Sequence, residues 1–301
     1  MANRWWLYQR ERFPLGSFAL LAFVLAFSAL AYSALTRGVH ALPGAGTLAA
    51  AAASAFLLFM QMRVLDEFKD FEDDMRCRPY RPVPRGLVTP GELAWIAMAA
   101  AVVELVIALM VDARLVWLLA AVWAYLALMT AEFFAPAWLK ARPFTYMASH
   151  LVVSALITLY LAAFDWLPEN ATPQPGLLAL AAASYFTGTL LEIGRKIRAP
   201  RDEEPGVVTY SAAWGRSAAV AAWFGAFLLT AGTGWLAAWQ IGFAAPFFVL
   251  IASLAAAAFW CCWRFTQAPI TGRARSIEAL SGAAALALNL ALGPIPLVLA
   301  S

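Results

Sequence analysis

Acidic and basic residues are concentrated in the stretch DEFKDFEDDMRCRPYRPVPRG, which follows a long apolar run. Asp66, Asp70 and Asp74 recur there at i, i+4 and i+8, so on a helix their carboxylates share one face. Mg²⁺ takes few carboxylates and completes its shell with water and phosphate oxygens. This row of aspartates beside arginines therefore indicates a site for a metal-bound phosphate. The alternative is a solvated acidic helix end with basic neighbours.

A second charged stretch reads LLEIGRKIRAPRDEEPGVVTYSAAWG and closes another apolar run. Glu192, Arg195 and Lys196 stand at the end of that run, and Asp202 follows in the connection. Ionisable groups at the inner end of a membrane span are costly unless they face a cavity or one another. A functional site explains them, and an ordinary loop with local ion pairs is the alternative.

The two acidic clusters, each followed by basic residues, have a joint explanation. Two sets of carboxylates can hold Mg²⁺ on either side of one diphosphate, while arginines and lysines bind its free oxygens. A neutralised diphosphate is a good leaving group, so an allylic carbon–oxygen bond can ionise. An apolar channel within a helix bundle would hold a lipid-like tail and keep water from the cation.

The remainder of the chain is apolar enough to lie in a membrane. Of its 301 residues 63% are hydrophobic and 13% are charged, and the mean hydropathy is +0.73. Runs of roughly 20 apolar residues recur, which is the length that crosses a ~30 Å hydrocarbon layer. We therefore expect an all-α, polytopic membrane bundle of nine transmembrane helices, with a central cavity open to the cytoplasmic side. The expected spans are residues 17–36, 46–65, 91–111, 114–134, 144–164, 177–197, 217–239, 246–265 and 277–299.

The placement of basic residues indicates the orientation of these spans. With the N-terminus inside, all of the 21 Lys and Arg residues except Arg37 and Arg114 fall on the cytoplasmic side. Nine spans then place the C-terminus outside. We expect the first apolar run to be kept as a span and not cleaved as a signal peptide. Ala-rich and Arg-rich usage favours a bacterial inner (cytoplasmic) membrane.

The expected organisation is one integral-membrane domain over residues 1–301. Residues 1–16 interleave arginines with Trp, Tyr and Phe, a composition typical of a segment in the headgroup layer. Residues 66–90 and 192–216 are expected to be charged cytoplasmic loops that bound the two halves of the site. The three cysteines do not form a disulfide framework.

Two further carboxylates fall within or near expected spans. Glu104 lies deep in the third span, where an unpaired carboxylate is expensive, so we expect it to be protonated or paired across the bundle. Glu132 lies near the inner end of the fourth span and could join the cavity.

The first charged stretch resembles the first motif of the UbiA superfamily of intramembrane prenyltransferases, NDxxDxxxD followed by RPLPSG. Asp66, Glu67, Asp70 and Asp74 occupy its four acidic or amide positions, and RPVPRG follows at the usual offset. Asp66 stands where the family usually has Asn, which conserves an oxygen ligand and adds charge. The two halves of the motif match within one 21-residue stretch, so the resemblance is specific.

The second charged stretch is similar to most of the second motif of that superfamily, NxxRDxxxDxxxGxxT. The matching residues are Glu192, Arg195, Asp202, Gly206 and Thr209.

Lys196 stands where the second motif has Asp, and the spacing from there to Asp202 is longer than in the motif. A lysine cannot bind Mg²⁺ but can pair with phosphate. Either Glu192 and Asp202 supply the second metal site, or Lys196 replaces the charge of one metal ion. The basic segment PAWLKARPFTY, with Lys140 and Arg142, resembles the loop of the family that contacts diphosphate.

The resemblance implies a Mg²⁺-dependent prenyltransferase that moves an isoprenyl group from an isoprenyl diphosphate to an aromatic or other lipophilic acceptor. Membrane lipid surrounds such an enzyme, and we expect no nucleic-acid partner. The alternatives are a terpene cyclase of the same fold and, less favoured, a non-catalytic lipid transporter, because the charges gather at one face and not at the midplane.

The residues expected to act in this reaction fall into three overlapping sets. The expected metal ligands are Asp66, Glu67, Asp70, Asp74, Glu192 and Asp202. The expected catalytic residues are Asp66, Asp70, Lys140, Arg195 and Lys196. The expected substrate-binding residues are Arg81, Arg85, Lys140, Arg142, Arg195, Lys196 and Tyr210.

Overall fold

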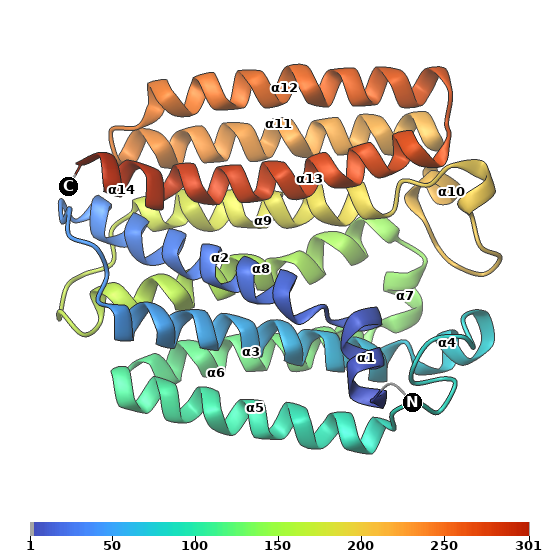
Figure 1. Cartoon of the computed structure of the whole chain (residues 1–301), viewed down its shortest axis with the longest axis horizontal. Helices are drawn as coiled ribbons and strands as arrows, with labels where there is room; N and C mark the ends of the chain where they lie inside the picture. The colour runs from blue at the N-terminus through green and yellow to red at the C-terminus, as the bar shows by residue number, and fades with distance from the viewer. Residues whose placement is uncertain (1–2, 301) are drawn as a thin grey trace.

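The computed structural model describes residues 3–300, and every regular element in that range is a helix (Figure 1). Eight helical segments are long and apolar enough to cross a membrane, and each coincides with an expected span. They are α2 (Leu15–Thr36), α3 (Ala45–Lys69), α5 (Pro90–Val111), α8 (Pro143–Trp166), α9 (Gly176–Arg195), α11 (Arg216–Gln240), α12 (Ala244–Gln267), and α13 (Thr271–Leu292) continued by α14 (Pro294–Ala300). The chain is therefore an all-helical integral membrane protein.

The remaining expected span, residues 114–134, is a shorter helix than its apolar run suggested. α6 (Leu115–Thr130) has 16 residues, or about 24 Å at 1.5 Å per residue, against a hydrocarbon layer of ~30 Å. It ends because η1 (Glu132–Phe134) has three consecutive residues with φ between 46° and 58°, a conformation that breaks a right-handed helix. The count of nine spans stays a prediction.

Four short helices gather at one end of the bundle, near the N-terminus and opposite the C-terminus (Figure 1). They are α1 (Arg4–Arg12), α4 (Phe71–Cys77), α7 (Pro136–Lys140) and α10 (Tyr210–Trp214). Both charged stretches of the sequence end here, so we call this region the charged end.

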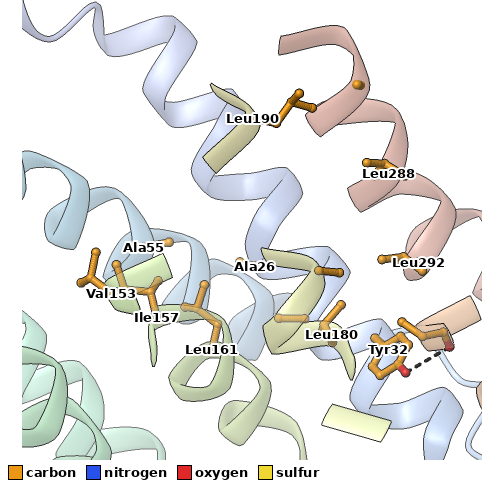
Figure 2. Close-up of a cluster of buried hydrophobic side chains, with 14 of the residues drawn as sticks. Ala26, Tyr32, Ala55, Val153, Ile157, Leu161, Leu180, Leu190, Leu288 and Leu292 are labelled. Atoms are coloured by element: carbon orange, nitrogen blue, oxygen red, sulfur yellow. Dashed lines mark hydrogen bonds between the residues drawn. The ribbon is translucent and has the colours of Figure 1, made fainter. Parts of the chain in front are cut away.

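Small residues let the long helices pack closely around a buried core. Ala26 of α2 and Ala55 of α3 are fully buried among leucine, isoleucine and valine side chains (Figure 2). Tyr32 of α2 donates its hydroxyl to the carbonyl oxygens of Gly176 and Ala237, each at 3.1 Å, and so ties three helices together. Without a hydrophobic driving force between helices in lipid, such close packing and interhelical hydrogen bonds hold the bundle.

The last expected span, residues 277–299, is divided at one glycine. α13 begins earlier than expected, at Thr271, and ends before Gly293, and Pro294 then starts α14. A Cβ on Gly293 would lie 2.6 Å from the carbonyl oxygen of Ser28, so only glycine allows this approach to α2.

The centre of the bundle is tightly packed. Between α2, α8, α9 and α13 the side chains enclose a space of about 10 Å³, bordered by polar groups such as Ser28, Ser184 and Asn289. This volume holds about one water molecule. The expected central cavity open to the cytoplasm stays a prediction.

Candidate active site

The three aspartates of the first charged stretch lie along one continuous helical path. α3 ends at Lys69 and α4 begins at Phe71, but the amide of Asp70 donates to the Asp66 carbonyl at 2.9 Å, and the amide of Asp74 donates to the Asp70 carbonyl at 2.8 Å. These i to i−4 hydrogen bonds continue the helical repeat, so the three aspartates lie on the same face, as their spacing predicted. Asp66 and Asp74 both interact electrostatically with Asp70.

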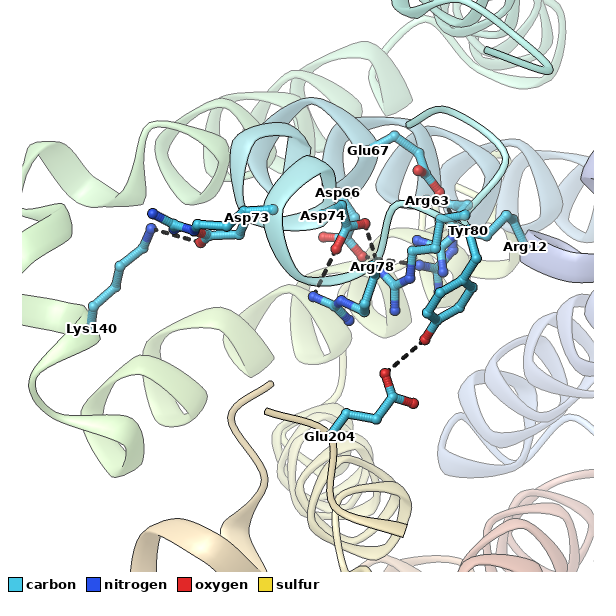
Figure 3. A network of polar contacts seen from close by, with 12 residues as sticks. Arg12, Arg63, Asp66, Glu67, Asp73, Asp74, Arg78, Tyr80, Lys140 and Glu204 are labelled. Atoms are coloured by element: carbon cyan, nitrogen blue, oxygen red, sulfur yellow. Dashed lines mark hydrogen bonds and ion pairs between the residues drawn. The ribbon is translucent and has the colours of Figure 1, made fainter. Parts of the chain in front are cut away.

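Asp74 is held by arginines. Its carboxylate forms an ion pair with Arg78 at 2.8 Å and accepts a hydrogen bond from Arg81 at 2.6 Å, and only 2% of its side chain is exposed (Figure 3). Arg81, expected to bind substrate, is therefore fixed by a carboxylate that was expected to bind metal. Charge-assisted pairs of this kind fix the direction in which a guanidinium presents its other donors.

Asp66 and Asp70 make fewer and longer contacts with basic side chains than Asp74 does, so they suit a hard cation better than Asp74. Asp66 meets Arg63 at 3.7 Å and Lys69 at 3.9 Å, which are long contacts. No ion pair joins Asp70 within residues 3–300. Burial, followed by the charges of Asp66 and Asp74, raises the pKa of Asp70, and Lys69 offsets this only in part. A divalent cation beside these two carboxylates would remove that electrostatic cost.

Glu67 points away from this pair. Its carboxylate, 2% exposed, accepts from Nε of Arg12 on α1 at 2.5 Å (Figure 3). Glu67 would have to leave Arg12 before it could reach a metal ion, so its expected role as a ligand stays a prediction.

The second charged stretch forms a compact cluster at the end of α9. Glu192 forms ion pairs with Arg195 at 2.5 Å and with Lys196 at 2.8 Å. The Lys196 ammonium lies 5.2 Å from the centre of the Tyr210 ring, and the amide of Tyr210 donates to the Lys196 carbonyl at 3.1 Å. Burial, aided by the charge of Glu192, raises the pKa of the Tyr210 hydroxyl, so it stays a neutral donor.

Asp202 lies apart from this cluster. It ends η2 (Pro200–Asp202), and in the described part of the chain its ion pair is a 3.9 Å contact with its neighbour Arg201. The structure brings Glu192, but not Asp202, close to Lys196. The expectation that Glu192 and Asp202 together supply a second metal site therefore stays a prediction, as does the alternative that Lys196 replaces the charge of one metal ion.

The two charged stretches meet directly at the charged end. The Tyr80 hydroxyl donates to Glu204 at 2.8 Å (Figure 3). Gly206 has φ of +80°, as expected for a sharp turn, and a Cβ there would lie 2.6 Å from Sγ of Cys77. Arg195 of α9 also lies within electrostatic range of Asp66 of α3, although the two form no ion pair within residues 3–300.

The basic segment after α6 contributes one residue to this meeting point. Lys140 lies 3.4 Å from Asp73, which also pairs with Arg76 (Figure 3). Although its slight burial acts in the opposite direction, these two cations hold the pKa of Asp73 below its usual value. Arg142 instead packs over Trp138, 4.6 Å from the ring centre, on its own segment.

Arg85 is also directed elsewhere, since it pairs with Glu11 of α1 at 3.0 Å. Arg85 and Arg142 are thus expected substrate-binding residues whose partners lie outside the two acidic clusters. Either would need to move to reach a ligand at those clusters.

Sequence reasoning missed three residues of this site. Arg78 holds Asp74, and Lys69 contacts Asp66 while its ammonium lies 5.2 Å from the centre of the Tyr146 ring on α8. Lys69 and Arg78 stand within the first charged stretch, so their position was a usable signal. Tyr146 ends the basic segment PAWLKARPFTY, which was also a usable signal, although the packing of α8 against α3 is what brings it beside Lys69.

No group of three or more His, Cys, Asp or Glu side chains within residues 3–300 is arranged to hold a metal ion. The reason is visible in the ion pairs, because Glu67, Asp74 and Glu192 each face basic side chains. Of the six expected ligands, Asp66 and Asp70 have the donor chemistry and the freedom that Mg²⁺ needs.

The comparison with protein families identifies the chain. Residues 20–277 match the profile described as the UbiA prenyltransferase family. The chain belongs to this family. A UbiA homolog from Aeropyrum pernix K1, solved in its apo form, matches with a TM-score of 0.68 and 16% identity over 92% of this chain and 96% of that one.

The solved structure of a digeranylgeranylglyceryl phosphate synthase is also similar in fold to this UbiA family member. It matches with a TM-score of 0.62 and 14% identity, over 97% of this chain and 99% of that one. At these identities the two solved structures establish the fold. No match was found among curated protein sequences. The resemblance read from the motifs is confirmed, and membership places the chain among membrane prenyltransferases.

Proposed function

We propose that the protein transfers an isoprenyl group from an isoprenyl diphosphate to an aromatic or other lipophilic acceptor within the membrane, in a Mg²⁺-dependent reaction. The observation that supports this most is that Arg195, at the end of α9, lies within electrostatic range of Asp66 on α3. This arrangement brings the basic end of α9 to the carboxylates of α3, so one diphosphate could meet both.

The basic residues of the charged end would bind the diphosphate. Arg195 and Lys196 pair with Glu192 of the second charged stretch, whereas Lys140 pairs with Asp73 and Arg81 with Asp74 of the first. Their positive charge would stabilise the negative charge that develops as the allylic carbon–oxygen bond breaks and its electron pair passes to the diphosphate. The resulting allylic cation is attacked by the acceptor, which then loses a proton.

The carboxylates that would hold the metal are those of Asp66 and Asp70, with Asp74 and Glu192 available if their basic partners turn to the diphosphate. Bound Mg²⁺ would supply further positive charge to the leaving group. Lys196 lies 2.8 Å from Glu192, so it can replace the charge of a second ion. Asp202 stays a candidate ligand only if the connection after α9 closes over the site.

We further propose that the charged end faces the cytoplasm of a bacterial inner membrane, with the N-terminus on that side. The basic residues gathered there support this orientation. The two termini lie at opposite ends of the bundle (Figure 1), which is what an odd number of spans requires.

Product analysis of the purified protein in lipid nanodiscs tests the proposal. With a series of isoprenyl diphosphates and aromatic acceptors, we expect a prenylated acceptor and pyrophosphate in equal amounts. Cyclic hydrocarbon formed without an acceptor would assign the protein as a terpene cyclase instead. If the diphosphate binds but no pyrophosphate is released under any of these conditions, the enzymatic proposal is contradicted and a transporter is favoured.

A further inference from the structure

The helices α3, α5 and α6 lie along one edge of the bundle (Figure 1). Side chains of these three helices border a cleft of about 260 Å³. Its walls are mostly apolar, and they include Met98, which is 53% exposed. Two polar side chains interrupt this lining, the amide of Gln61 and the indole of Trp123. The outer faces of α5 and α6 are apolar, so the mouth of the cleft opens toward lipid tails.

Gln61 presents an unsatisfied acceptor at this cleft. Its side-chain nitrogen donates to the Ala97 carbonyl at 3.3 Å, which directs the amide. The residue is only 5% exposed, and Oε1 is buried without a hydrogen-bond partner among residues 3–300. A buried acceptor without a donor costs free energy, so an atom that donates to it would be bound favourably.

A buried carboxyl group lies behind the same wall. Glu104 is fully buried, and its Oε2 accepts a hydrogen bond from Nε1 of Trp123 at 2.9 Å. Trp123 lies on α6, so Glu104 has a partner on another helix, one of the two outcomes expected for it. The side-chain amide of Gln61 also lies close enough to Glu104 to act on its carboxyl group by hydrogen bonding. The donors of this wall, Nε2 of Gln61 and Nε1 of Trp123, are directed at Ala97 and Glu104, so within residues 3–300 Oε1 of Gln61 is an acceptor at the cleft that is left without a donor.

The cleft is separate from the candidate active site. Gln61 and Asp66 are five residues apart on α3, a rotation of about 500°, which leaves them about 140° apart around the helix axis. Asp66 lies within electrostatic range of Arg195 of α9, whereas Gln61 faces α5 and α6.

We propose that this cleft binds a membrane-soluble compound that carries a hydroxyl group on an apolar ring or chain. The hydroxyl group of this compound donates a hydrogen bond to Oε1 of Gln61, and its apolar part extends past Met98 into the lipid. An apolar cavity of ~150 Å³ holds one benzene molecule. The larger volume here accommodates one ring with the start of an alkyl chain. The proposal does not depend on the prenyl-transfer reaction.

Photolabelling of the full chain in nanodiscs tests this site. The probe is a diazirine analogue of 4-heptylphenol, and the competitors are unlabelled 4-heptylphenol and heptylbenzene, compared per mole of lipid. We expect the label on α5 and α6 beside the cleft, with heptylbenzene competing about tenfold more weakly than the phenol because it cannot donate. Equal competition by the two compounds would overturn the proposal without any mutation.

Substitution of the acceptor provides a second test. Gln61→Met keeps the length of the side chain and removes its acceptor, so we expect the phenol to bind about tenfold more weakly and heptylbenzene to bind as before. Gln240→Met, at the far end of α11, is the matched control. Unchanged phenol binding in Gln61→Met, or an equal loss in Gln240→Met, would contradict a site at Gln61.

Discussion

The Tyr80 hydroxyl donates to the Glu204 carboxylate at 2.8 Å across 124 residues of sequence, and this bond joins the two charged connections of the molecule. Both connections must be held together if one diphosphate is to meet the carboxylates of α3 and the basic end of α9. The Cys77–Gly206 approach lies beside this bond, so the contact is one of packing as well as charge.

Tyr80→Phe removes this bond and keeps the ring. Tyr80 is 57% exposed, so we expect the unfolding free energy to fall by less than ~1 kcal/mol. Hydrogen exchange should nevertheless speed up in the connection after η2, because its tie to the first charged stretch is lost. Unchanged exchange there would show that the packing of Cys77 on Gly206 alone holds the two connections together.

The Arg12–Glu67 pair should carry much of the stability of the charged end. Its side chains are 12% and 2% exposed, so Arg12→Ala leaves a buried, unpaired carboxylate and should cost about 3–5 kcal/mol. Arg4→Ala breaks an equally short but exposed pair with Glu92 and should cost less than ~1 kcal/mol. Thermal unfolding in detergent compares the two variants.

A double variant separates charge from packing at this pair. Arg12→Met combined with Glu67→Met replaces both charges by apolar groups, and we expect it to regain most of the stability lost in Arg12→Ala. A double variant as unstable as Arg12→Ala would show that α1 is held by something other than this ion pair.

Gly293 should tolerate no side chain. In Gly293→Ala the new Cβ would lie 2.6 to 3.1 Å from backbone atoms of Ser28. Backbone atoms cannot rotate away as a side chain can, so we expect the unfolding free energy to fall by about 1–3 kcal/mol. Gly282→Ala is the matched control on the same pair of helices, because its Cβ meets nothing within 4 Å. Equal unfolding temperatures for the two variants would contradict the close contact of α13 with α2.

Much of this architecture follows from local patterns that sequence alone displays. Apolar run lengths predicted the long helices, because each must cross the same hydrocarbon layer. The spacing of Asp66, Asp70 and Asp74 predicted their shared face, because an α-helix repeats every 3.6 residues. The end of α6 at Thr130 was not predicted, since the left-handed turn after it involves Glu132 and two phenylalanines instead of glycine.

Ion pairs at helical spacing, such as Asp74 with Arg78, follow from the sequence, but the partners that lie far apart in the chain could not be predicted. The spacing of the residues does not show that α1 folds back so that Arg12 forms an ion pair with Glu67. Nor does it show that Arg142 lies over the ring of Trp138 in the same segment. These contacts depend on how helices distant in sequence pack. Motif membership therefore identified the residues that gather at the charged end, but not which of them point at one another.

Asp70 is the residue on which the proposed chemistry depends most. Its burial and its carboxylate neighbours disfavour its charge, so Asp70→Asn should leave the metal-free protein as stable as the native chain or more so. The same change should lower turnover about 100-fold or more, because it removes a ligand of the metal that stabilises the leaving group. Glu72→Gln, an exposed neighbour on α4, is the matched control and should leave turnover unchanged.

The most direct measurement is therefore pyrophosphate release by the purified protein, with and without Mg²⁺, over a series of isoprenyl diphosphates and acceptors. We predict release that requires Mg²⁺, persists in Glu72→Gln and is lost in Asp70→Asn while that variant stays folded. Release that is equal in Asp70→Asn and the native chain, or that does not need Mg²⁺, would contradict the assignment of Asp66 and Asp70 as the metal-binding centre.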